Sequence, residues 1–93
     1  MGRKSLAARF YEDLEGEEER DGTWLVLYDF KGVKPSSKFW SNIARLVGLS
    51  GGGSLIQYSV FMTDGKRAAL AMVKLVRHYG GEVAVFKGER FEV

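Results

Sequence analysis

Asp29 is the residue with the clearest potential for chemistry. It ends the segment 24–29, WLVLYD, whose continuous apolar run is typical of a strand buried on both faces. A carboxylate at the end of such a strand lies at the edge of the sheet, where it can meet a ligand, or it accepts backbone hydrogen bonds in the following turn. Magnesium tolerates one or two carboxylates together with water and phosphate oxygens. One Asp cannot hold the metal alone, so a site at Asp29 would need the Asp29 of a second copy of the chain.

Basic side chains in two places could meet phosphate groups. The set that flanks Asp29 comprises Lys31, Lys34 and Lys38, and the set on the outward face of the second predicted helix of the domain comprises Arg67, Lys74 and Arg77. Residues 1–22 hold four Lys/Arg and seven Asp/Glu, a balance of −3, whereas residues 23–93 hold ten and five, a balance of +5. A basic domain attracts nucleic acid, although such charge also serves solubility.

Composition excludes several other kinds of site. Cysteine is absent, which removes disulfides and thiolate metal sites, and the one histidine, His78, makes a structural zinc site improbable. Gly51-Gly52-Gly53 lacks the Gly-Lys-Ser/Thr that completes a phosphate loop. No apolar run is long enough for a membrane helix, so a cytoplasmic location with no membrane partner is expected.

The chain divides into an extension and one small domain. Residues 1–22 are an acidic N-terminal extension, either docked or mobile, with a short helix that Ser5 could cap. Residues 23–93 form the domain. Its first helix starts at Ser36 or Ser37, presents Asn42 outward and stops at Gly48.

The second half of the domain repeats the strand and helix pattern. Residues 54–62 form one bent strand or two short ones, and the pattern leaves both open. Asp64 is placed to cap the second helix, which runs to Tyr79. Residues 82–87 are a strand, and residues 91–93 could begin another.

This order predicts an α+β domain, a ferredoxin-like βαββαβ sandwich with both helices on one face of the sheet. Along the first strand, Leu25 and Leu27 point to one side and Val26 and Tyr28 to the other, so both sides are apolar. Two helices cover only one side. A second copy is the simplest cover for the other, which predicts a homodimer built sheet to sheet.

Two segments together resemble a known family. LVLYDF, residues 25–30, and IQYSVFMTDG, residues 56–65, are similar to the signature segments of the small CRISPR-associated adaptation protein, the ferredoxin-like partner of the CRISPR integrase. The resemblance covers roughly residues 24–88. It implies a homodimer in which two Asp29 side chains bind Mg²⁺, or Mn²⁺, for cleavage of RNA or DNA, with Tyr28 and Phe61 counted with the site.

Two functions follow from this resemblance. The first is a metal-dependent endonuclease of CRISPR adaptation, the antiviral defence step that acquires spacers. The second is a non-catalytic dimeric scaffold that binds DNA and bridges integrase subunits. An unrelated ferredoxin-like interaction domain is a third interpretation of the same elements.

Overall fold

The computed structural model describes residues 4–17, 22–32, 34–57, 59–89 and 91. Within them the helices are α1 (Leu6–Asp13), α2 (Ser37–Ser50) and α3 (Lys66–His78), and the strands are β1 (Thr23–Asp29), β2 (Ser54–Gln57), β3 (Val60–Thr63) and β4 (Glu82–Gly88). The element order is αβαββαβ. The predicted order βαββαβ is therefore wrong for the chain as a whole, because α1 stands before β1. In the described part of the chain, none of these helices has the length and apolar character needed to cross a membrane.

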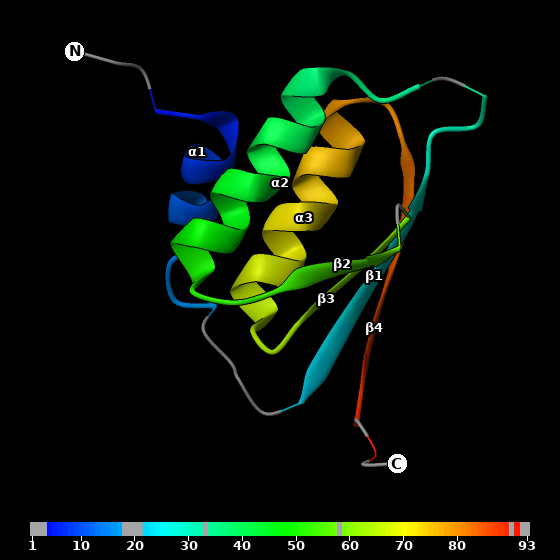
Figure 1. The fold of residues 1–93 in the computed structure, drawn as a ribbon. Helices are drawn as coiled ribbons and strands as arrows, with labels where there is room; N and C mark the ends of the chain where they lie inside the picture. Colours follow the sequence, from blue (N-terminus) through cyan, green and yellow to red (C-terminus); the bar gives the residue numbers. More distant parts are fainter. Residues whose placement is uncertain (1–3, 18–21, 33, 58, 90, 92–93) are drawn as a thin grey trace.

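The strands form one antiparallel sheet in the order β2-β3-β1-β4. All three helices of the described residues lie on one side of this sheet, and none of them covers the other side (Figure 1). The molecule is a small α+β fold that is compatible with the ferredoxin-like arrangement. β1 occupies an inner position between β3 and β4, as expected for an apolar run.

The ends of two helices differ from the sequence prediction. Ser36 caps α2 by accepting the N–H of Phe39 at 3.4 Å, but the helix continues through Gly48 and ends at Ser50. Gly51 follows as the C-cap, and its φ of 70° suits a residue without a Cβ. Asp64 does not cap α3. Gly65 occupies the N-cap position without a side-chain hydrogen bond, and its own N–H donates to Oγ1 of Thr63 at 3.3 Å.

The strands resolve the alternatives left open for residues 54–62. The segment is two strands, β2 and β3, and the pairing of β2 with β3 contains a register irregularity between Leu55 and Gln57. Of the strand start predicted at residues 91–93, Phe91 is not in a strand, and the other two residues lie outside the described ones.

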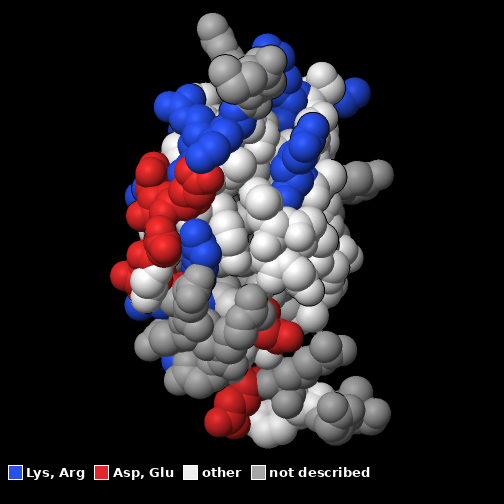
Figure 2. Space-filling view, turned by 90° about the vertical axis from the view of Figure 1, so that its left-hand side faces the viewer, with Lys and Arg blue, Asp and Glu red and all other residues white. Residues whose placement is uncertain are grey.

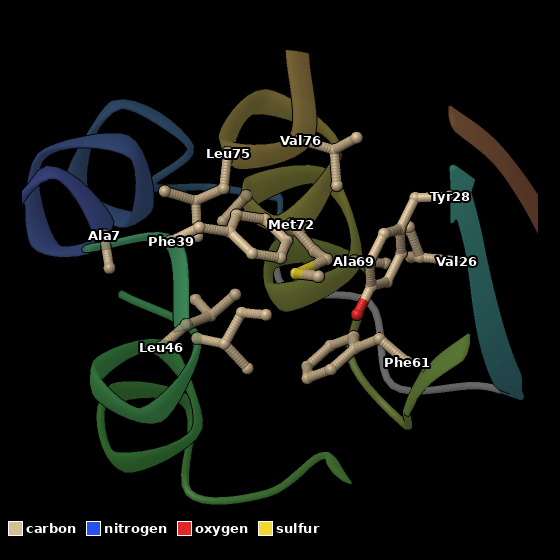
Figure 3. Packing of buried hydrophobic residues seen from close by; sticks show 12 residues of the cluster. Ala7, Val26, Tyr28, Phe39, Leu46, Phe61, Ala69, Met72, Leu75 and Val76 are labelled. Carbon is tan, nitrogen blue, oxygen red and sulfur yellow. The ribbon is translucent and has the colours of Figure 1, made fainter. Parts of the chain in front are cut away.

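The hydrophobic core lies between the sheet and the helices (Figure 3). Its largest fully buried side chains are Phe39, Phe61, Leu46, Met72, Leu75, Val26 and Val76. On the opposite face of β1, Leu25 and Leu27 remain 36% and 39% exposed. The alternation predicted for β1 is thus present, with one apolar face covered by helices and the other uncovered in the single chain.

α1 packs against α2 and α3 on the side away from the sheet (Figure 1). Ser5 caps this helix by accepting the N–H of Ala8 at 3.1 Å, as predicted. Ala7 is fully buried, and its N–H donates to Oδ1 of Asn42 at 2.8 Å. Asn42 is therefore buried under α1, and its predicted outward position is wrong because the extension covers that part of α2.

Candidate nucleic-acid interface

Asp29 is exposed at the carboxyl end of β1, on the helix-free face of the sheet. One oxygen of its carboxylate, Oδ1, accepts the backbone N–H of Lys31 at 3.1 Å. The turn after the strand is tight: Lys31 and Gly32 have φ values of 41° and 80°, both in the left-handed region. Asp29 thus accepts a backbone hydrogen bond in the following turn, the structural role that the sequence left open beside ligand binding. The same bond orients the carboxylate at the end of the strand.

A second carboxylate lies across from Asp29. Glu82 begins β4 directly opposite Asp29, so both side chains project from the helix-free face. Nζ of Lys31 lies 3.3 Å from Oε2 of Glu82, in an ion pair whose side chains are 65% and 70% exposed. Such an exposed pair contributes little to stability, but it offsets the repulsion between neighbouring carboxylates.

A cavity of about 650 Å³ opens beside Asp29. Its walls combine aromatic and apolar groups with lysines and a carboxylate: Tyr28, Asp29, Phe30, Lys31, Gly32, Lys34, Pro35, Trp40 and Ser59 line it. Two separate parts of the chain therefore meet here, namely the stretch that runs from the end of β1 through the following loop to the start of α2, and the β2–β3 connection. The volume is in the range of small-molecule sites.

Tyr28 and Phe61 lie on the side of the sheet opposite to the Asp29 side chain. Both point from their strands toward the helices (Figure 3), Phe61 is fully buried, and Tyr28 is only 5% exposed. The Tyr28 hydroxyl has no hydrogen-bond partner among the described residues, and burial raises the pKa of Tyr28 to about 12. The structure therefore places Phe61 away from the cavity, whereas Tyr28 contributes to the cavity wall but directs its side chain to the face of β1 opposite to the Asp29 carboxylate.

The predicted basic sets differ in their surroundings. Lys31 and Lys34 line the cavity beside Asp29, and Lys38 is exposed in the first turn of α2. On α3, the Arg67 guanidinium stacks 3.8 Å from the centre of the Tyr11 ring and its Nε donates to the Tyr11 carbonyl at 2.7 Å. The fold thus brings Lys31 and Lys34 to the candidate site, and it holds Arg67 against α1.

Two further α3 cations, Lys66 and Lys74, also lie near the extension. Nζ of Lys74 lies 5.6 Å from the centre of the Phe10 ring, and Nζ of Lys66 lies 3.0 Å from Oε2 of Glu17. Arg77 is exposed. Figure 2 shows this helical side of the molecule, where acidic groups lie directly beside basic ones. The acidic neighbours reduce the positive potential that a polyanion would meet on this side.

Sequence patterns do not single out three residues of the site. Trp40 is a partly buried aromatic residue packed against the core, and it lines the cavity. Ser59 and Glu82 have no motif around them and reach the site through strand pairing. Register between distant strands is the only signal that could have found them.

The metal prediction has a limited basis in one chain. Asp29 offers an exposed carboxylate with oxygen donors of the kind that Mg²⁺ prefers, but in the described ranges no three His, Cys, Asp or Glu side chains cluster. A second copy would have to supply further ligands. Comparison of the chain with family models, with curated proteins and with solved structures gives no match.

Proposed function

We propose that this protein is a CRISPR adaptation protein that acts on nucleic acid as a ferredoxin-like homodimer and partners a CRISPR integrase subunit. In this proposal Asp29 of two copies holds Mg²⁺ or Mn²⁺ for hydrolysis of RNA or DNA phosphodiester bonds. The observation that carries it is the exposed carboxylate of Asp29 beside a cavity that Lys31 and Lys34 line. The sequence resemblance supplies the family.

The residues divide the work of phosphodiester hydrolysis. Lys34 and Lys31 would attract the phosphate, and Asp29 of two copies would hold the cation. A bound divalent cation would polarise the phosphate and lower the pKa of a water molecule. Hydrolysis would consume one water molecule: its oxygen would bond to phosphorus, the bond to the leaving ester oxygen would break, and the proton released by the water would end on that oxygen. Tyr28 and Phe61 contribute by packing behind β1 rather than by contact with the phosphate.

The uncovered sheet face supports the dimer. Leu25, Leu27 and Phe86 project from it, and Phe86 is 57% exposed. An apolar area of this kind on a small basic domain favours association with a second copy. A two-fold axis near the end of β1 would bring two Asp29 side chains together, which is the condition for the metal site.

A magnesium-dependent nuclease assay on the Asp29→Asn variant tests the proposal. The substitution removes the charge but keeps an oxygen that can accept the Lys31 N–H, so the turn should persist. Cleavage should fall by about a hundredfold or more, since the metal loses its charged ligand. Asp64→Asn, the same change at an exposed position outside the cavity, should cleave as the wild type does. Equal cleavage by both variants would remove Asp29 from the chemistry.

One observation favours the scaffold as a second candidate. Asp29 already accepts the backbone N–H of Lys31, so it has a structural role in the turn that does not involve a metal. A scaffold needs only cations against phosphate and a partner-binding surface. It predicts nucleic-acid binding by the wild type, no cleavage, and unchanged affinity in Asp29→Asn.

A further inference from the structure

The cavity beside Asp29 has walls of two chemical kinds. Phe30, Pro35 and Trp40 provide an apolar side, and Lys31 and Lys34 provide the charge. Aromatic rings next to lysines are the combination with which proteins hold unpaired nucleotides, because the base stacks on the ring while the cation meets the phosphate. A purely electrostatic duplex-binding surface does not need the aromatic wall.

Trp40 is held in place for such a contact. It follows Phe39, which is fully buried, and the two rings lie 5.1 Å apart at 68°. Trp40 itself is partly buried while lining the cavity. A ring fixed by the core loses little conformational freedom when a base stacks on it, which increases affinity.

The charged groups set where a nucleotide can lie. Lys34 is exposed and makes no ion pair with another described residue, whereas Lys31 is shared with Glu82. The Asp29 carboxylate repels a phosphate in the absence of metal, but it can accept a hydrogen bond from the amino group of a base. This favours a phosphate at Lys34 and the base at Trp40.

We infer that this cavity binds an unpaired nucleotide, with its base on Trp40 and its phosphate at Lys34, so that the protein prefers single strands or frayed ends to blunt duplex. In a duplex the base faces are stacked and the base edges are paired, so neither reaches Trp40 without unstacking. The inference deepens the proposed function and rests on it for the ligand class, nucleic acid.

Fluorescence of Trp40 tests this inference without a change in the cavity. The chain has two tryptophans, and Nε1 of Trp24 is buried without a partner in the described part of the chain, so Trp24→Phe leaves Trp40 as the sole tryptophan at no cost in hydrogen bonds. Titration of this variant with a short single-stranded oligonucleotide should quench the emission. A blunt duplex of the same sequence should bind more weakly and quench little.

A substitution at Trp40 provides the second arm. Trp40→Leu should lower affinity for the single strand by roughly tenfold, from the loss of one base–ring stack, and leave duplex affinity within about twofold. Trp40→Phe should restore most of the single-strand affinity. Circular dichroism and the melting temperature of each variant confirm folding. If Trp40→Leu does not fold, the Trp24→Phe titration still decides.

The outcomes separate this inference from the proposed function. Salt-sensitive binding of single strand and duplex with equal affinity and no quenching would overturn the Trp40 site and leave nucleic-acid binding intact. Quenching by the single strand without magnesium-dependent cleavage would support the site and remove the nuclease. Absence of binding to either probe would overturn both.

Discussion

Tyr28 and Asp29 are neighbours in the chain, but their side chains project from opposite faces of β1. This follows from the alternation of a strand, so a catalytic role for the Tyr28 hydroxyl at the Asp29 carboxylate has no geometric basis within one chain. The same alternation makes Tyr28 a packing residue. Its hydroxyl lowers the stability of the fold, because it is buried with no hydrogen-bond partner among the described residues.

Tyr28→Phe should therefore stabilise the protein by about 1 kcal/mol, since it keeps the ring and removes an unsatisfied polar atom. The pKa of Tyr28 is raised from 10.0 to about 12, so the stability linked to its neutral form is complete below pH 10 and is lost as pH rises through 12. Urea unfolding at pH 7 and between pH 10 and 12 measures both effects. A variant that is less stable at pH 7, or that loses stability with the wild-type pH profile, would contradict this account.

Sequence alone predicts the position of Asp29 but not its surroundings. Its place at the end of an apolar strand can be read from six residues. Glu82 lies opposite because of the register between β1 and β4, and Trp40 lines the cavity beside Phe39, which α2 buries in the core. Both depend on contacts between residues far apart in the chain, which local patterns do not encode.

At the scale of elements, the strands follow the pattern better than the helix ends do. β1 and β4 lie where the apolar runs predict them, and residues 54–62, which the pattern left open as one strand or two, contribute to β2 and β3. Gly48 did not stop the helix, because a glycine in a helix interior costs only about 1 kcal/mol. The helix continues to Ser50, which is buried and whose Oγ donates to the carbonyls of Val47 and Gly52. Local sequence patterns also could not predict the docking of α1, because it involves a hydrogen bond between Ala7 and Asn42, which lie far apart in the chain.

The helix-free face of the sheet predicts a dimer that one substitution should break. Leu27 is 39% exposed in the single chain, and a lysine there would place a charge in an apolar interface. We expect wild type at twice 10.4 kDa by light scattering and Leu27→Lys as a folded monomer. Leu49→Lys, at a similarly exposed leucine on α2, should remain dimeric. Wild type that is monomeric at micromolar concentration would refute the dimer.

At the scale of the whole molecule, charge is distributed unevenly between the extension and the domain. The extension brings acidic groups and aromatic rings onto α3, where they engage Arg67, Lys66 and Lys74. Lys31 and Lys34, beside Asp29, are exposed and line the cavity instead. Composition predicts a basic domain. Which of its basic side chains remain accessible to a nucleic acid can be known only from the position of the extension against α3.

The salt dependence of nucleic-acid affinity in two single-charge variants tests the central claim, a nucleic-acid interface at the end of β1, most directly. Lys34→Gln and Lys74→Gln each remove one positive charge from the same chain, so their effects on net charge are equal. Lys34→Gln should weaken binding several-fold and make the log–log salt slope shallower by about 0.7–0.9, the loss of one phosphate contact. Lys74→Gln should change little, because Lys74 lies against Phe10. Equal losses in the two variants, or a larger loss from Lys74→Gln, would contradict the account.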